Sequence, residues 1–327
     1  MKSRRNFLLF SLAMSLSAVN AAQAGIRMPS ILPKNDNDIF LQYYNAASGV
    51  PAVNFHDSTI SAIDGVTLNL RIATPIVIIG KAPVIVFIPD LGAQANSYDL
   101  LVGALVNNGF AVIVVAPPNV RTARTDNNTI LRRNDARAQY IRFVLDKKAD
   151  ILGFLGDDIR KIDQNKIGVF GHGDGALTAL ELIGWSRSLN FSLDYADARI
   201  NASIALAPRF ETGVRNSASN ARRVIYGRGM VIADYQSVED MPRNTGLMGL
   251  GLPIIGADFG NLLYSPNNPR RRRAERPARE CLASSIAAAS IFYDWLLKDK
   301  RERVEDLNHL NSRAIPNLTE SMLFGRY

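Results

Sequence analysis

The chain contains few cysteines and histidines, the residues that form disulfides and bind zinc. It has one cysteine, Cys281, and three histidines among its 327 residues. A single cysteine excludes a disulfide within the chain, so the fold must depend on a buried apolar core. No Cys/His cluster and no His-Glu-x-x-His sequence is present. We therefore expect no metal site of the zinc type.

Phosphate- and dinucleotide-binding motifs are absent as well. There is no P-loop, and the glycine-rich sequence at residues 171–175 lacks both the G-x-G-x-x-G spacing and a place near the first strand. The apolar run near the start of the chain covers residues 7–19, which is shorter than the roughly 20 residues that cross a bilayer. We expect no cofactor, and no transmembrane segment in the mature chain.

Residues 1–24 have the pattern of an export signal. The apolar run is followed by a small-residue cleavage site that ends at Ala24. The charged start contains three basic residues, Lys2, Arg4 and Arg5. The sequence Ser-Arg-Arg-Asn-Phe-Leu at residues 3–8 favours the twin-arginine type of signal over an ordinary secretory one. Cleavage after Ala24 would place the mature chain in the periplasm of a bacterium or outside the cell.

Positive charge exceeds negative charge only mildly. The net charge is +8, and it falls to +5 when the three basic residues of the signal are removed. Much of the excess lies in a run interrupted by prolines, which predicts a loop. This run contains Arg270, Arg271, Arg272, Arg273, Arg276 and Arg279. The loop could bind an anionic lipid or polysaccharide surface, although a solvated loop is the plainer interpretation. No nucleic-acid partner is expected.

The rest of the chain divides into three parts. Residues 25–50 contain two prolines among scattered polar residues and are expected to be an irregular entry segment. Residues 51–298 are expected to form one domain, because no internal repeat or linker interrupts them, and an apolar content of 47% is ample for its core. Residues 299–327 are charged and then irregular in pattern, as in a tail.

Strand and helix patterns alternate through the domain. Continuous apolar runs predict strands buried on both faces at residues 84–88, 110–116, 167–170 and 200–207. Helical spacing predicts helices at residues 97–107, 136–145 and 284–297. Residues 52–55 and 59–63, followed by 66–73, predict an antiparallel pair at a sheet edge, and the polar segment 122–133 predicts a loop. The expected fold is a three-layer α/β fold with a mostly parallel central sheet flanked by helices.

The stretch at residues 166–180 combines a strand, a tight turn and a helix. An apolar strand leads into Gly171-His172-Gly173-Asp174-Gly175, and an Ala/Leu-rich helix follows. This is the context of the G-x-S-x-G nucleophile motif, in which the serine lies on a strained turn between a strand and a helix. Here Gly173 stands in the place of the serine. Glycine adopts such a conformation without steric cost, so the turn itself does not need the serine.

These segments, in this order, resemble the α/β-hydrolase family, and in particular its secreted esterases similar to dienelactone hydrolases and polyester hydrolases. The resemblance covers residues 53–297. It is carried by the strand at 84–88 with Leu91-Gly92 and Tyr98, by residues 107–112 with Pro117, by the elbow at 166–172, and by Ala205-Leu206-Ala207-Pro208. It implies the three-layer fold and a site for carboxylic-ester hydrolysis.

The resemblance also implies that the catalytic triad is degenerate. Gly173 replaces the nucleophile, and Phe259 stands where the family has its histidine base. The acid position corresponds best to Asp240 and next best to Asp234. Without a histidine to orient, such an aspartate has no catalytic task and is equally well interpreted as a surface residue.

Two residues could compensate for the loss. Asp174 could act as the nucleophile, although His172 would then take a position that requires a small side chain. His309 could fold back as a base, although its charged and polar neighbours favour a solvated helix end. His172 itself matches a family position that is usually a packing residue.

The turn after the strand at 84–88 should supply part of an oxyanion hole. The resemblance implies main-chain donors at Leu91 and Asp174. Asp90 stands where the family commonly has glycine, and its negative charge has the wrong sign to stabilise a developing oxyanion. The expected vestigial pocket contains Gly173, Asp90, Leu91 and Asp258.

The sequence therefore predicts a non-catalytic binding protein with a hydrolase fold. Loss of both the nucleophile and the base leaves little of the chemistry, and an apolar or ester-like ligand is expected in the pocket. Two alternatives stay open. One is an active carboxylic-ester hydrolase with an atypical nucleophile. The other is a surface-interaction protein that uses Arg270, Arg271, Arg272 and Arg273.

Overall fold

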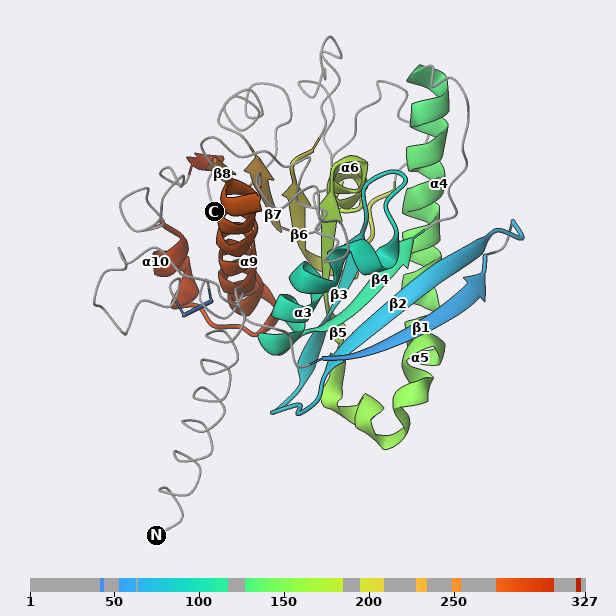
Figure 1. The fold of residues 1–327 in the computed structure, drawn as a ribbon, viewed down its shortest axis with the longest axis horizontal. Helices are drawn as coiled ribbons and strands as arrows, with labels where there is room; N and C mark the ends of the chain where they lie inside the picture. The colour runs from blue at the N-terminus through green and yellow to red at the C-terminus, as the bar shows by residue number, and fades with distance from the viewer. Residues whose placement is uncertain are drawn as a thin grey trace.

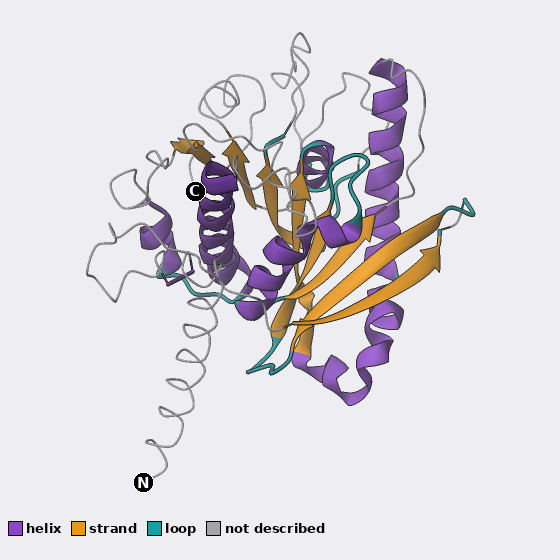
Figure 2. Ribbon diagram, viewed as in Figure 1, coloured by secondary structure: helices purple, strands orange, loops and turns teal. Residues whose placement is uncertain are grey.

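The computed structural model describes residues 42–43, 53–62, 64–116, 127–184, 195–208, 228–233, 249–253, 275–308 and 322–324. Within these residues, nine strands form one sheet in the order β1-β2-β4-β3-β5-β6-β7-β8-β9. The six strands from β4 to β8 in this order pair in parallel, whereas β1, β2 and β9 pair antiparallel with their neighbours. The chain is thus an α/β protein with a mostly parallel sheet (Figure 2).

The predicted antiparallel pair forms one edge of the sheet. Strand β1 (Val53–Ser61) pairs with β2 (Thr67–Pro75), and β2 pairs in turn with β4. Along the first half of β2, Leu68 and Leu70 are buried while Thr67 and Asn69 are exposed. This alternation arises because one face of the strand packs on the core and the other meets solvent.

The parallel strands form the centre of the sheet. Every residue of β3 and β4 is buried, which explains their continuous apolar sequences, because helices cover both faces. The strands are β3 (Ala82–Ile88), β4 (Ala111–Ala116), β5 (Ile162–His172), β6 (Ile200–Leu206), β7 (Arg228–Ala233) and β8 (Gly249–Pro253).

Helices form a layer on each face of the sheet (Figure 1). Helices α3 (Asp99–Asn107) and α9 (Glu275–Leu297) cover one face and contact each other. Helices α4 (Asn127–Asp146) and α6 (Asp174–Glu181) cover the other face, also in mutual contact. The expected arrangement of a mostly parallel sheet between two layers of helices is confirmed.

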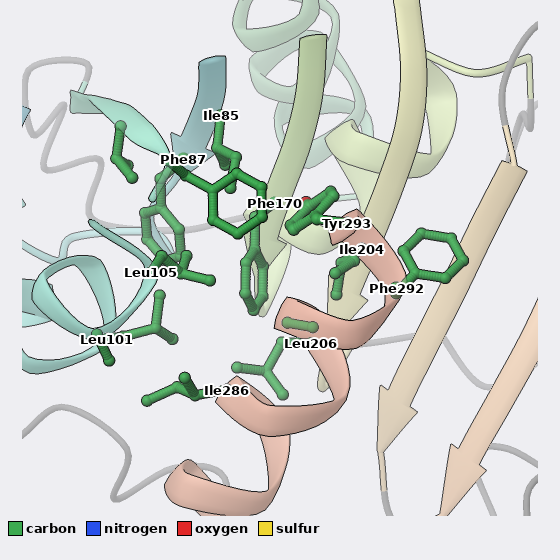
Figure 3. Packing of buried hydrophobic residues seen from close by; sticks show 14 of the residues in the cluster. Ile85, Phe87, Leu101, Leu105, Phe170, Ile204, Leu206, Ile286, Phe292 and Tyr293 are labelled. Atoms are coloured by element: carbon green, nitrogen blue, oxygen red, sulfur yellow. The ribbon is translucent and has the colours of Figure 1, made fainter. Parts of the chain in front are cut away.

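Each face of the sheet has its own apolar core. On the α3 and α9 face, the rings of Phe87, Phe170 and Tyr293 pack together, with ring centroids 5.4 Å and 6.4 Å apart for successive pairs (Figure 3). On the α4 and α6 face, alternate residues such as Val86 and Val169 pack against the helices. The two sets belong to alternate positions of the same strands because successive side chains of a strand point to opposite faces.

The remaining described elements are short. They are η1 (Ala95–Tyr98), α5 (Lys148–Ile151), η2 (Leu152–Lys161), α10 (Arg303–Asn308) and β9 (Met322–Phe324). Residues 299–327 were expected to be a tail, charged and then irregular; α10 and β9 lie within them, and β9 pairs antiparallel with β8. No described helix is both long enough and apolar enough to cross a membrane.

Two segments expected to be loops are partly helical. Helix α4 begins at Asn127, so the expectation of a loop through residue 133 is wrong in its second half. A helix satisfies its own main-chain hydrogen bonds, so a polar stretch can extend a helix that packs elsewhere. Helix α9 begins at Glu275 and therefore includes Arg276 and Arg279. Pro277 does not prevent this, because proline is tolerated in the first turn of a helix.

Candidate functional site

The strand order itself marks a position for a ligand. Strand β3 lies between β4 and β5, and the chain passes from β3 to β4 on one side before it crosses to β5 on the other. In open α/β sheets, ligands bind at the carboxyl ends of strands where the order reverses in this way. Asp90 and Leu91 follow β3 at this point, and Gly173 and Asp174 follow β5. The topology therefore brings four of the predicted site residues to one place.

Gly173 is the central residue of the turn between β5 and α6. Its φ of 57° and ψ of −117° are strained for a residue with a side chain. Its N–H donates a hydrogen bond of 3.0 Å to the carbonyl of Leu206 at the end of β6. Asp174 begins α6, so the position that corresponds to an elbow nucleophile is that of Gly173.

The glycines on either side of the turn have no room for a side chain. A Cβ built on Gly171 would lie 2.1 Å from the carbonyl oxygen of Gly175, and one built on Gly175 would lie 2.2 Å from that of Ile88. Both distances are far shorter than a van der Waals contact. The turn thus packs main chain against main chain and has the tightness that a nucleophile elbow requires.

The carboxylate of Asp90 binds both of the main-chain donors expected at the site. Its Oδ1 accepts hydrogen bonds of 2.9 Å from the N–H of Leu91 and 3.0 Å from the N–H of Asp174. Asp90 is only 6% exposed. The sequence indicates the sign of this charge but not its position. The structure places one carboxylate oxygen on both of these main-chain donors.

Asp90 also occupies the space beside Gly173. A Cβ built on Gly173 would lie 2.3 Å from Oδ1, 2.5 Å from Cγ and 2.9 Å from Oδ2 of Asp90. The carboxylate could leave this space only by giving up its two hydrogen bonds. A serine at position 173 and Asp90 in its present conformation therefore exclude each other.

Tyr98 and His172 form a buried pair beneath Asp90. The hydroxyl of Tyr98 accepts a hydrogen bond of 2.9 Å from the N–H of Asp90 and lies 2.9 Å from Nδ1 of His172. Both side chains are 3% exposed, and their rings meet edge to face with centroids 5.7 Å apart. Nδ1 of His172 is thus engaged with Tyr98, and the residue packs between the sheet and the loop after β3.

Arg137 holds the same loop from the other face of the sheet. It lies on α4, is 5% exposed, and donates a hydrogen bond of 2.9 Å from Nη2 to the carbonyl of Pro89. Neither Arg137 nor Tyr98 was among the site residues expected from the sequence. Tyr98 carried part of the family resemblance, but nothing in the pattern of residues 136–145 indicated that one arginine of that helix is buried.

Several predicted site residues lie outside the described residues. These are Phe259, Asp240, Asp234, Asp258, His309 and the run Arg270, Arg271, Arg272 and Arg273. The other described histidine, His56, lies on β1, which β2 and β4 separate from β3, and its ring stacks on Phe154. Across the described ranges, no three His, Cys, Asp or Glu side chains gather in a way that could hold a metal ion.

Comparison with models of protein families and with curated proteins gives no match for this chain. The interpretation of the site therefore depends on its own geometry. In that geometry, a tight turn centred on Gly173 lies beside two main-chain N–H donors, and a carboxylate of the same chain binds both.

Proposed function

We propose that this chain is an exported α/β-hydrolase-fold protein that has no esterase activity and binds an apolar ligand. The observation that supports this most directly is the position of the Asp90 carboxylate, which binds the N–H groups of Leu91 and Asp174 beside Gly173. The export signal at residues 1–24 supports a periplasmic or secreted location.

The arrangement of the elbow favours the hydrolase fold. In that fold the nucleophile turn joins a central strand to a helix, and the oxyanion donors come from the residue after the nucleophile and from the loop after β3. Here the turn joins β5 to α6, and the two donors are Asp174 and Leu91. The site thus keeps the main-chain parts of a hydrolase and lacks the side chain that reacts.

Ester hydrolysis is disfavoured at this site for two reasons. Acyl transfer requires a nucleophile, and Gly173 provides none. The reaction also builds negative charge on the carbonyl oxygen, which the oxyanion donors must stabilise. With Asp90 on those donors, the substrate oxygen would meet a negative carboxylate instead. The missing nucleophile and the carboxylate on the donors both raise the activation barrier of ester hydrolysis. Neither prevents a ligand from binding next to the turn.

Leu91 favours a ligand with apolar surface. Its side chain is 45% exposed although it lies next to the Asp90 carboxylate. Covering such a side chain is favourable by about 25 cal/mol for each Å² removed from water. An ester-like ligand would bind here through its apolar part, because its carbonyl oxygen could not use the two N–H donors that Asp90 holds.

Activity measurements test the absence of catalysis. The purified protein should hydrolyse short-chain p-nitrophenyl esters no faster than buffer, and a fluorophosphonate probe should leave it unlabelled. A known serine esterase serves as the positive control. Turnover or labelling that disappears in Asp174→Asn would contradict the proposal and support the alternative of an active hydrolase with an atypical nucleophile.

Ligand binding is tested with Nile red, an uncharged apolar dye. We expect Leu91→Ser to weaken dye binding at least roughly threefold, because the variant loses apolar contact at the site. Phe154→Ser is the matched control, since Phe154 is 44% exposed on η2, away from the turn. Equal effects of the two substitutions, or no effect of Leu91→Ser, would sink the idea that the dye binds at this site.

A further inference from the structure

We propose that Asp90 is a built-in ligand of an anion-binding site, and that Gly173 provides the space in which this ligand lies. The inference goes beyond the proposed function, because it concerns how the site is filled in the absence of any other molecule. The class of ligand that the site recognises is a small carboxylate, represented here by the side chain of Asp90.

The donors of the site come from two separate segments. Leu91 belongs to the loop after β3, and Asp174 is the first residue of α6, yet their N–H groups converge on the same oxygen, Oδ1 of Asp90. The N-terminal end of a helix also carries a partial positive charge that favours an anion. Hydrogen bonds from main-chain N–H groups to a carboxylate are stronger than those between neutral groups.

The peptide group between Pro89 and Asp90 is held at both of its polar atoms, which fixes the main chain immediately before the Asp90 carboxylate. The N–H of Asp90 donates to the hydroxyl of Tyr98, and the preceding carbonyl, that of Pro89, accepts from Arg137. All three side chains, Asp90, Tyr98 and Arg137, are more than nine-tenths buried. Because the Asp90 carboxylate is part of the chain, its effective concentration next to the two N–H donors is high whether or not a carboxylate is present in solution.

Gly173 determines whether the carboxylate fits. Any side chain at position 173 would begin with a Cβ 2.3 Å from Oδ1 of Asp90. Because that oxygen is held by two main-chain donors, it could move away only by losing both hydrogen bonds. Asp90 and Gly173 therefore form a coupled pair, in which each residue type depends on the other.

A double-mutant cycle tests the coupling. The four proteins are the wild type, Gly173→Ala, Asp90→Ala and the double variant, and the readout is the melting temperature. A positive φ strains alanine at position 173 in both backgrounds, so only the collision with Asp90 differs between them. We expect Gly173→Ala to lower the melting temperature clearly more when Asp90 is present than when it is absent. Equal losses in the two backgrounds would overturn the proposal.

A second experiment uses acetate to test whether the N–H groups of Leu91 and Asp174 form an anion-binding site. It requires no substitution at position 173. In Asp90→Ala the donors of Leu91 and Asp174 lose their ligand, so saturating acetate should raise the melting temperature by roughly 2 °C or more over chloride at equal ionic strength. The wild type should not respond, because Asp90 holds the donors. Asp90→Asn is the control, since its side-chain oxygen can fill the same place without charge. An equal response of all three proteins, or none in Asp90→Ala, would overturn the proposal.

Discussion

The hydroxyl of Tyr98 lies between the N–H of Asp90 and Nδ1 of His172, at 2.9 Å from each nitrogen. One buried oxygen thus joins the loop after β3 to the end of β5. These are the two segments whose main chains form the candidate site. The position of the Asp90 main chain therefore depends on a side chain that contributes nothing to the surface of the site.

Replacing Tyr98 by phenylalanine should destabilise the protein through this contact. The variant keeps the ring but leaves the N–H of Asp90 without the hydroxyl that now accepts it, and a buried polar group in that state costs about 1–3 kcal/mol. The free energy of unfolding in urea measures the loss. Tyr140→Phe is the control, because its hydroxyl donates to Asp64 at an exposed place. Similar losses in the two variants would argue against the role assigned to Tyr98.

Gly168 should not tolerate a side chain. It lies on β5 under α9, and a Cβ there would be 2.7 Å from Cε1 of Tyr293. The hydroxyl of Tyr293 donates to the carbonyl of Val169, which restricts how far the ring can move. We expect Gly168→Ala to cost about 1–3 kcal/mol, as is usual for overpacking. Gly153→Ala, where nothing lies within 4 Å, should be neutral, and a loss as large as that at Gly168 would contradict this explanation.

Ala207 should be more stable as glycine. It follows β6 with a φ of 48°, in the left-handed region that costs an ordinary residue about 1 kcal/mol. We expect the free energy of unfolding of Ala207→Gly to equal or exceed that of the wild type. Ala202→Gly, in the middle of β6, should instead cost about 1 kcal/mol or more, because glycine weakens a strand and a buried methyl group is lost. The prediction fails if both substitutions destabilise equally.

Asp294 should make the protein sensitive to acid. It is fully buried on α9, with Oδ1 2.8 Å from Nζ of Lys298 and Oδ2 2.6 Å from Nζ of Lys300. Burial by itself raises the pKa of this carboxyl, but the two lysines and the hydroxyl of Tyr43 more than offset that effect and hold the pKa below its ordinary value.

A lowered pKa in the folded state fixes the direction of the effect. The stability that Asp294 contributes is fully present above the pKa of an unfolded aspartate, about 3.9, and is lost as the pH falls through the lower folded value. We expect the difference in unfolding free energy between wild type and Asp294→Asn to be largest near neutral pH and to shrink below about pH 4.

Asp294→Asn should also cost about 3 kcal/mol near neutral pH, because it removes the fully buried carboxylate that the partly buried Lys298 and Lys300 bind. The control is Asp57→Asn, whose carboxylate binds Arg71 but is 72% exposed, so its loss should be about 1 kcal/mol at most. Urea unfolding at several pH values measures both variants. If the difference in unfolding free energy between wild type and Asp294→Asn did not change with pH, the assigned effect of the lowered Asp294 pKa on stability would be contradicted.

The sequence predicted the parts of the fold that depend on apolar runs and on tight turns. The strands at β3 and β4 are fully buried, and the elbow lies between β5 and α6 as expected. The helical extension of α4 was missed because its residues are polar, and a polar stretch has the same pattern whether it is a loop or a solvated helix.

The sequence could not predict how Asp90 is bound. Its charge suggested only that it would repel an oxyanion, an expectation that leaves the N–H groups of Leu91 and Asp174 without a ligand from the chain. Whether the carboxylate binds the N–H groups of Leu91 and Asp174 depends on a side-chain conformation and on the space next to Gly173, neither of which a sequence pattern contains. The buried hydrogen bond from Arg137 to Pro89 is of the same kind, since it joins segments 48 residues apart.

The described sheet ends in two very different edge strands. One edge is β1, nine residues long, and the other is β9, with only three residues, paired to β8. Edge strands offer unpaired main-chain groups to other molecules, and a very short strand offers few of them. If β9 were lost, residues 249–251 of β8 would present their outer main-chain groups to a neighbouring chain. Residues 322–324 thus end the described sheet on this side with an edge that is only a short template for pairing with another strand.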